Sequence, residues 1–274
     1  MKPAWSWQFE PETLDRISVV LPLRMTKDWA WGASTGAGVK VAVIDSGIDP
    51  THPAVGRVSG GVALEYDPDA ESGVRMVEGP HEDLFGHGTA CAGIIRKAAP
   101  EAELYSVRVL GSKLSGKGVV FAGGLKWAID NGMQVVNMSL STGKRDYFDL
   151  FHELADEAYF HHMMLVSAVN NVPSPSFPSQ YSSVFSVAAH DGKDPFRFHY
   201  NPAPPVEFGA PGIDVEVAWL NNTTIEATGN SFAAPHIAGL IARVLGKHSG
   251  LTPFEMKTVL RALADNALEA AAGT

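Results

Sequence analysis

The feature that most constrains the fold is an alternation of short, β-branched apolar runs with longer amphipathic segments. The apolar runs are residues 39–45, 104–110, 135–140, 164–169 and 184–189. Segments with helical periodicity lie between and after them, at 89–98, 119–132, 147–162, 231–248 and 253–267. Continuous apolar runs are typical of parallel strands buried on both faces, and parallel strands need long crossovers. The pattern predicts an α/β fold with three layers, in which a central, mostly parallel sheet is doubly wound by helices.

The boundaries of the chain and of its last helix also follow from sequence signals. Because the chain has 274 residues and no internal repeat or linker, we expect a single domain over residues 1–274. Within this range, residues 1–24 are expected to be an N-terminal extension. Thr252, Pro253 and Glu255 predict a helix start, because a capping threonine, a proline at the first helical position and a glutamate two residues further on complete a capping box.

Charge and composition exclude several classes of partner. Lys and Arg number 21 against 30 Asp and Glu, a net charge of −9 without any long basic run, so we expect no nucleic-acid partner. The longest apolar runs, such as 163–169, are far shorter than the roughly 20 residues of a membrane span. Cys91 is the only cysteine, so an intrachain disulfide is impossible. Glu10, Glu12 and Asp15 stand where a secretion signal would be apolar, which predicts a cytoplasmic protein.

Three distant segments each surround a residue type used in nucleophilic catalysis. They are VAVIDSGID with Asp45, GHGTACAG with His87 and GNSFAAPHIAG with Ser231. A serine hydroxyl needs a base within hydrogen-bond reach, and that base needs a third group to fix its tautomer. Taken alone, Asp45 could cap a turn, His87 could be structural and Ser231 could be an N-cap. Found together, they predict a catalytic triad.

Local sequence supports these roles. Gly86 and Gly88 allow a tight turn around His87 and leave its imidazole projecting. Ser231 opens a helix, so its N–H and the helix dipole would face a developing oxyanion. The helix runs into Pro235, which we expect to be tolerated because the first turn has no amide to lose.

The three segments, in the order Asp, His, Ser, resemble the subtilisin-like (subtilase) family of serine peptidases from about residue 25 to about residue 250. The resemblance implies an endopeptidase that cleaves peptide or protein substrates through an acyl-enzyme and needs no cofactor. It also implies an asparagine that completes the oxyanion hole. SAVNN (167–171) assigns that role to Asn170, with Asn171 as the competing assignment.

The same resemblance implies that substrate adds as a strand to exposed backbone edges and fills a side-chain pocket. The implied substrate-binding residues are Ser139, Leu140, Ser141, Gly116, Lys117, Gly118, Ala168 and Val169. Val169 and Ser141 stand where the family usually has glycines, so we expect a narrowed pocket and a smaller preferred side chain on the acyl side of the cut bond. The opposing possibility is that residues 171–178, where the family often has a longer loop, leave the other wall of this pocket open.

Further departures concern the nucleophile segment, metal and the cysteine. Asn230 and Phe232 replace the family's common threonine and methionine, which we interpret as local repacking. No insertion interrupts the helix after His87, and Ala54 stands where the family often has a calcium-binding aspartate. We therefore expect the main calcium site to be absent and predict no metal ligands. Cys91, one helical turn beyond His87, is expected to pack beneath the histidine.

Some alternatives stay open at this level. Residues 17–25, ISVVLPLRM, are predicted as a strand that leads into the core, the alternative being a short inhibitory segment. The substrate role is either general intracellular turnover or precursor processing. A catalytically silent binding protein of the same fold is a rival, as is a transpeptidase or peptide macrocyclase that uses the same acyl-enzyme. The sequence carries no prediction of oligomeric state.

Overall fold

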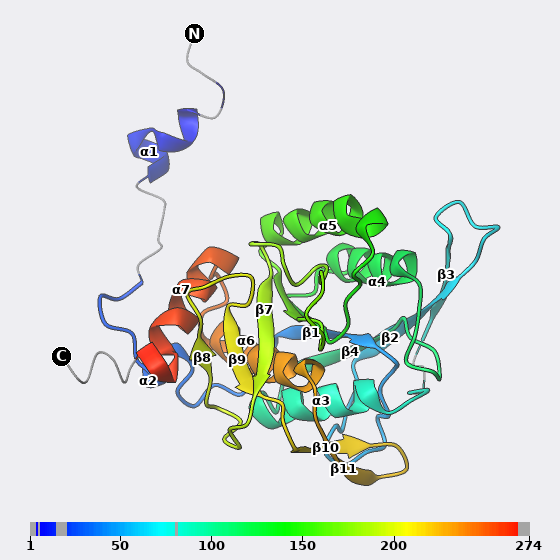
Figure 1. Cartoon of the computed structure of the whole chain (residues 1–274). Coiled ribbons are helices and arrows are strands. Elements are labelled where there is room, and N and C mark those ends of the chain that lie inside the picture. Colours follow the sequence, from blue (N-terminus) through cyan, green and yellow to red (C-terminus); the bar gives the residue numbers. More distant parts are fainter. Residues whose placement is uncertain (1–3, 5, 15–20, 80–81, 268–274) are drawn as a thin grey trace.

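A long central sheet with helices on both faces dominates the computed structural model, which describes residues 4, 6–14, 21–79 and 82–267 (Figure 1). Within these residues the sheet has nine strands in the order β3-β2-β4-β1-β5-β6-β7-β9-β8, and β10 and β11 form a separate hairpin. The strands are β1 (Lys40–Asp45), β2 (Gly60–Tyr66), β3 (Val74–Glu78), β4 (Glu103–Arg108), β5 (Val135–Met138), β6 (Met164–Ala168), β7 (Phe185–His190), β8 (His199–Tyr200), β9 (Phe208–Pro211), β10 (Val215–Trp219) and β11 (Thr223–Ala227). The helices are α1 (Pro11–Leu14), α2 (Lys27–Ala30), α3 (His87–Ala98), α4 (Gly118–Asp130), α5 (Phe148–Phe160), α6 (Asn230–Lys247) and α7 (Pro253–Leu263), with short 3-10 turns η1 (Ser6–Phe9) and η2 (Arg145–Tyr147).

The pairing of the strands confirms the predicted three-layer α/β fold. β1 lies between β4 and β5, and both pairs are parallel. β5, β6, β7 and β9 continue the sheet in the same parallel sense. Antiparallel pairs occur only at the two ends of the described sheet, between β2 and β3 and between β8 and β9. The predicted apolar runs therefore form its buried centre.

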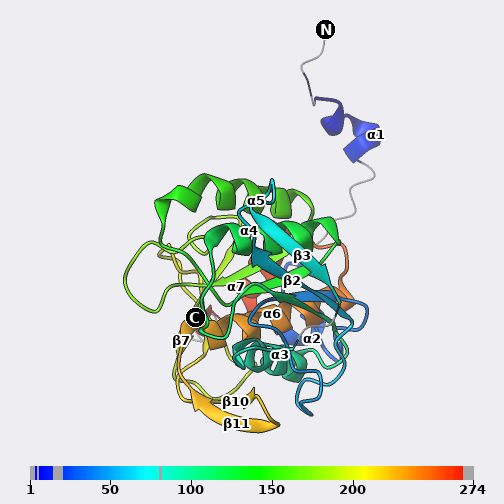
Figure 2. The same ribbon diagram turned by 90° about the vertical axis from the view of Figure 1, so that its right-hand side faces the viewer.

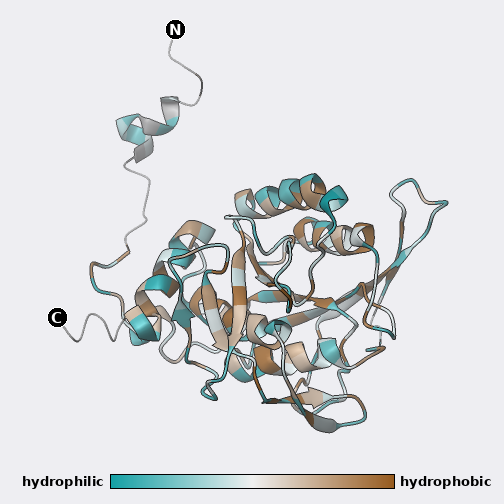
Figure 3. Ribbon diagram, viewed as in Figure 1, coloured by the Kyte–Doolittle hydropathy of each residue, from teal (hydrophilic) through white to brown (hydrophobic). Residues whose placement is uncertain are grey.

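Side chains of each central strand alternate between two apolar layers. In β1, Val41 and Val43 join the cluster packed by α3, α6 and α7, whereas Ala42 and Ile44 join the cluster packed by α4 and α5. Strand positions that are covered on both faces favour apolar side chains, which explains the unbroken run from Val41 to Ile44. In the hydropathy colouring, apolar residues are concentrated along the central strands, and apolar and polar residues alternate along the covering helices (Figure 3).

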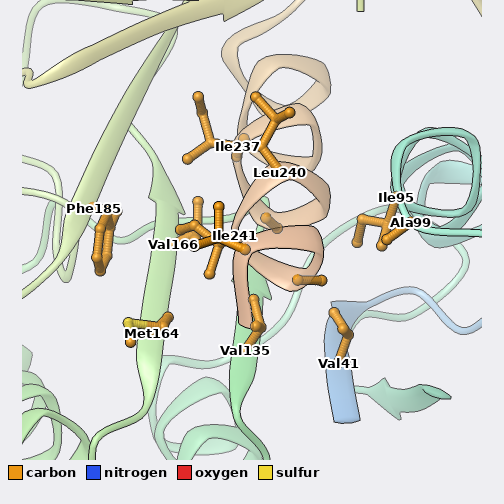
Figure 4. Close-up of a cluster of buried hydrophobic side chains, with 14 of the residues drawn as sticks. Val41, Ile95, Ala99, Val135, Met164, Val166, Phe185, Ile237, Leu240 and Ile241 are labelled. Carbon is orange, nitrogen blue, oxygen red and sulfur yellow. The ribbon is translucent and has the colours of Figure 1, made fainter. Parts of the chain in front are cut away.

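The helix that carries Ser231, α6, is buried between the sheet and α3. Ile237, Leu240 and Ile241 lie on it among Val166 of β6 and Ile95 of α3 (Figure 4). Fully burying one such side chain contributes about 1.5–3 kcal/mol. The helix that begins at His87 and the helix that contains Ser231 are thus packed against each other and against the same sheet.

The predicted capping box of α7 is confirmed. Thr252 Oγ1 accepts a hydrogen bond from the N–H of Glu255, and the Glu255 carboxylate accepts one from the N–H of Thr252 at 2.7 Å. The helix ends at Leu263, earlier than the periodic pattern suggested.

Several segments differ from the sequence expectation, because β2, β3 and β8 to β11 lie outside the predicted apolar runs. The β2–β3 hairpin forms one edge of the sheet, which Figure 2 presents toward the viewer, although its glycines and charged residues gave no strand signal. In the predicted strand 17–25, residues 17–20 lie outside the described part of the chain. Residues 21–25 form no strand; Leu21 and Met25 instead lie partly buried against the core.

Across the described residues, the helices include none with both the length and the apolar character needed to traverse a bilayer.

Candidate active site

The carboxyl ends of three neighbouring strands bring the predicted site residues together. β1 ends at Asp45, β5 leads into Ser139–Ser141, and β6 leads into Val169–Asn171. Because β1, β5 and β6 are parallel neighbours, these ends meet at one edge of the sheet.

Asp45 and His87 form a buried hydrogen-bonded pair. Nδ1 of His87 lies 2.9 Å from each carboxylate oxygen of Asp45. Asp45 is fully buried and His87 is 5% exposed. The arrangement fixes the proton of a neutral ring on Nδ1 and leaves Nε2 free to accept another, which is the orientation that a general base requires.

Glycines on both sides of His87 permit this approach. A β-carbon on Gly88 would stand 2.0 Å from the carbonyl oxygen of Gly47, so the turn after β1 and the first turn of α3 can touch only at glycine. Gly86 has a φ of 112°, and a β-carbon there would lie 2.6 Å from the Trp219 ring. The flanking glycines therefore allow the histidine helix to start against the end of β1.

Asp83, which was not among the residues predicted for the site, supports the same turn. One carboxylate oxygen accepts from Ser46 Oγ at 2.8 Å and from the N–H groups of Phe85 and Gly86, while the other accepts from Thr89 N and Oγ1. It ties the residue after Asp45 to the first turn of α3, where the exposed helix N–H groups favour a carboxylate. The sequence signal that could have identified Asp83 is an acidic residue four positions before His87.

The backbone of Ser231 is anchored in a way that corrects the expectation for Pro235. Since α6 starts at Asn230, Pro235 lies beyond the first turn, and its missing N–H would have bonded to the carbonyl oxygen of Ser231. That oxygen instead accepts from Ser139 Oγ at 2.7 Å and from Cys91 Sγ at 3.7 Å. The proline thus leaves the Ser231 carbonyl free to accept from Ser139, just after β5, and from Cys91 in α3.

Cys91 packs beneath the pair. Its sulfur lies 3.8 Å from Asp45 Oδ2 and 3.9 Å from His87 Nδ1. Burial raises the pKa of this thiol despite the nearby His87, so the protonated, unreactive form is favoured. Among the described residues, these three form the group whose donor atoms are close enough to hold a metal ion, within 4.8 Å of one another. Their donor atoms are already bonded to each other, so hydrogen bonding alone accounts for the cluster.

The electrostatics of His87 result from two opposing effects. Burial of the ring opposes its protonation, whereas the neighbouring Asp45 carboxylate and the Cys91 sulfur favour the charged ring more strongly. The pKa of His87 is consequently held well above its ordinary value of 6.5.

One cavity of about 220 Å³ unites most of the predicted residues. It is lined by His87, Ser231, Ser139, Leu140, Ser141, Ala168, Val169 and Asn170, together with Asn171, Leu110, Leu114 and Phe121. Gly116 and Lys117 line a neighbouring cavity of about 450 Å³ that shares Leu110 with the first. Gly118 begins α4 against the ring of Tyr147. The two predicted substrate-binding edges therefore lie side by side in adjacent cavities.

The two candidate oxyanion asparagines differ in what their side chains contact. Asn170 Nδ2 donates to Ser174 Oγ at 2.9 Å, within its own loop. Asn171 Oδ1 accepts from the N–H of Asn230 at 2.9 Å. A β-carbon placed on Gly229 would lie 3.7 Å from Asn171 Nδ2 and 3.2 Å from Ser231 Oγ. Asn171 Nδ2 and Ser231 Oγ therefore both lie beside Gly229.

The fold and this site define a subtilisin-like protein, and comparison with known proteins gives the same result. The sequence profile of the subtilase family matches residues 36–273. The chain therefore belongs to the subtilase family. Subtilisin DY of Bacillus licheniformis is 32% identical over 246 residues, which cover 84% of this chain and 85% of that protein.

Other relatives are longer than this chain. The chain spans 37% of the minor extracellular protease Epr of Bacillus subtilis, at 31% identity, and 59% of a thermostable alkaline protease of Halalkalibacterium halodurans, at 34% identity. Among solved structures, a cold adapted subtilisin-like serine proteinase matches with a TM-score of 0.67 and 26% identity, covering 91% of this chain and 89% of the other.

Proposed function

We propose that this chain is a serine endopeptidase in which Ser231 attacks the peptide carbonyl carbon. His87 accepts the hydroxyl proton at Nε2 and passes it to the leaving amine, and Asp45 stabilises the imidazolium that forms between these steps. Water then repeats the sequence on the acyl-enzyme and releases the acid. The observation that carries the proposal is the buried Asp45–His87 pair with 2.9 Å contacts, beside a serine that lines the same cavity.

The oxyanion is stabilised by the N–H of Ser231 and the side-chain amide of Asn171. We assign this role to Asn171 in place of Asn170. The assignment is supported by the 2.9 Å bond from the Asn230 N–H to Asn171 Oδ1 and by the position of Asn171 Nδ2 beside Gly229, which Ser231 Oγ also adjoins. Asn170 instead stabilises its own loop through Ser174.

The substrate is an extended peptide that lies along the backbone of Ser139–Ser141 and of Gly116–Gly118. A restricted specificity is supported by the side chains of Val169 and Ser141, which both line the cavity beside Ser231. Selective processing of a precursor is thereby favoured over general turnover. The cytoplasmic location stays a prediction from the sequence.

Active-site labelling tests the reaction class. A fluorophosphonate probe should label the wild-type chain once, with labelling lost in Ser231→Ala and retained in Ser249→Ala, a change at an exposed serine. Peptide hydrolysis should disappear with the label. A folded wild-type chain that neither reacts nor cleaves would identify a silent binding protein. Products that carry an added amine in place of water would identify the transpeptidase alternative.

A further inference from the structure

The carboxamide of Asn230 connects the start of α6 to two strand ends. Its Oδ1 accepts a hydrogen bond from the N–H of Ala189, in β7, at 2.9 Å. Its Nδ2 donates to the carbonyl oxygens of Val169 at 3.2 Å and Asn170 at 3.1 Å, just after β6. The Asn230 side chain therefore bonds to backbone groups in β7 and just beyond the end of the neighbouring strand β6. In the sequence, Asn230 is adjacent to the proposed nucleophile.

The backbone of the same residue reaches the oxyanion side chain. The N–H of Asn230 donates to Asn171 Oδ1 at 2.9 Å. The segment Val169–Asn171 is thus held at three successive residues by Asn230, twice through its carboxamide and once through its backbone. Movement of this segment would change the positions of both the Asn171 amide and the Val169 wall of the cavity.

Only a carboxamide satisfies this arrangement. Two carbonyl oxygens require two N–H donors, and the Ala189 N–H requires an acceptor, which together are what an asparagine side chain offers. A threonine hydroxyl has a single proton and cannot donate to both carbonyls. An aspartate could still accept from the N–H of Ala189. Its second carboxylate oxygen, however, would face the carbonyl oxygens of Val169 and Asn170, which cannot donate a hydrogen bond to it.

We propose that Asn230 is a positioning residue that fixes the Val169–Asn171 segment against the start of α6, and so sets both the oxyanion amide and the wall of the specificity pocket. The inference rests on the proposed peptidase function and on Asn171 as the oxyanion donor. It assigns a role to a position where the sequence suggested local repacking.

The test is a double-mutant cycle between Asn230→Asp and Asn171→Ala, read as kcat and KM separately. Removing an oxyanion donor costs roughly 10²–10³ in kcat, so displacing one should cost roughly 10–100-fold, with little change in KM. In the Asn171→Ala background the same substitution should lower kcat by less than about threefold, because the amide it positions is already gone. Selectivity among acyl-side residues should shift in both backgrounds, since Val169 is present in both.

Asn201→Asp is the matched control. Asn201 makes the same set of contacts, with Nδ2 donating to the carbonyls of Ala203 at 2.7 Å and Val206 at 2.8 Å and Oδ1 accepting from Ala203 N at 3.0 Å, but it does not line the catalytic cavity. It should leave kcat and selectivity unchanged. If Asn230→Asp fails to fold by circular dichroism, Asn230→Ala removes the same bonds without adding charge and completes the cycle.

Equal losses of kcat in the two backgrounds would overturn the proposal, as would a lowered melting temperature with kcat and selectivity unchanged. If the folded wild-type chain shows no turnover at all, the proposed function fails and this inference fails with it. If the wild type is active but the losses of kcat from the two substitutions are additive, the positioning role of Asn230 is overturned and the proposed peptidase function stands.

Discussion

The hydroxyl of Ser139 donates a 2.7 Å hydrogen bond to the backbone carbonyl oxygen of Ser231. That oxygen is available because Pro235 removes the N–H that would otherwise occupy it. The missing helix hydrogen bond at Pro235 therefore allows Ser139, just after β5, to bind the backbone of Ser231.

Ser139→Ala should lower both stability and turnover. Loss of a hydrogen bond of this kind costs about 1 kcal/mol, and a change of that size in the transition-state energy corresponds to roughly a fivefold loss of kcat. Thermal melting and steady-state kinetics measure the two effects, with Ser249→Ala as the control. A variant that melts earlier but retains full kcat would show that the bond supports the fold alone.

Activity should rise with pH along a limb whose midpoint lies above 6.5, because the pKa of His87 is raised and only the neutral ring accepts a proton. The same shift stabilises the folded state below the unfolded pKa of 6.5, and this contribution is lost as pH rises through the folded value. The pH profile of kcat/KM gives the midpoint, and proton NMR of His87 in Ser231→Ala gives it without turnover. Asp45→Asn, which removes the charge that favours the imidazolium, should lower the NMR midpoint. An unchanged midpoint would contradict this account.

Asn171→Ala should reduce kcat by roughly 10²–10³, the cost of removing one oxyanion donor. Asn170→Ala should reduce it by less than about tenfold, since its amide bonds to Ser174 within the loop. Binding of a peptide aldehyde, which forms a tetrahedral adduct, should weaken in parallel with kcat. The reverse ranking of the two variants would restore Asn170 as the oxyanion donor.

Val169→Gly should widen the specificity cavity. For peptides that differ only in the acyl-side residue, the wild type should favour alanine over phenylalanine, and the variant should shift this ratio of kcat/KM toward phenylalanine by roughly tenfold or more. Val77→Gly serves as the control, because Val77 is 39% exposed on the edge strand β3 and does not line the cavity. A wild-type preference for phenylalanine or tyrosine would mean that the other wall of the pocket is open.

Acid should destabilise the fold through His236. Burial, together with Lys97 and His190, lowers the pKa of this residue to about 4, although a contact with the backbone of Pro195 opposes the shift. Between pH 6.5 and about 4 the unfolded chain binds a proton that the folded chain does not, so stability falls as pH drops through this window. At 1.36 kcal/mol per pKa unit the full loss is roughly 3 kcal/mol. Urea denaturation at pH 7 and pH 4.5 should show a smaller difference in His236→Gln than in the wild type or in His161→Gln, a change at an exposed histidine. Equal differences in all three would assign the acid sensitivity to other groups.

Local patterns in the sequence were sufficient for the five central strands β4, β1, β5, β6 and β7, for the helices that cover them and for the three candidate triad segments. Residues 41–44 are all apolar because this part of β1 is covered on both faces, and position 88 is glycine because the turn after β1 leaves no room for a side chain there. Such constraints act on each residue separately, so they are visible without knowledge of distant contacts. The β2–β3 hairpin was missed because, as an edge, it tolerates glycine and charge and so lacks an apolar run.

Tertiary structure alone decided which side chains meet at the site. The bond from Ser46 to Asp83, the bond from Ser139 to the Ser231 carbonyl, and the different partners of Asn170 and Asn171 all involve side chains whose positions the sequence did not predict. Neighbouring asparagines have the same chemistry in a sequence, and only the position of Asn230 on α6 distinguishes them. The sequence by itself therefore determined the family, the fold and the residue types of the proposed chemistry. Packing of α6 against two strand ends decided how the side chains of the site are oriented. Hydrogen bonds between separate elements depend on the relative positions of those elements in the folded chain.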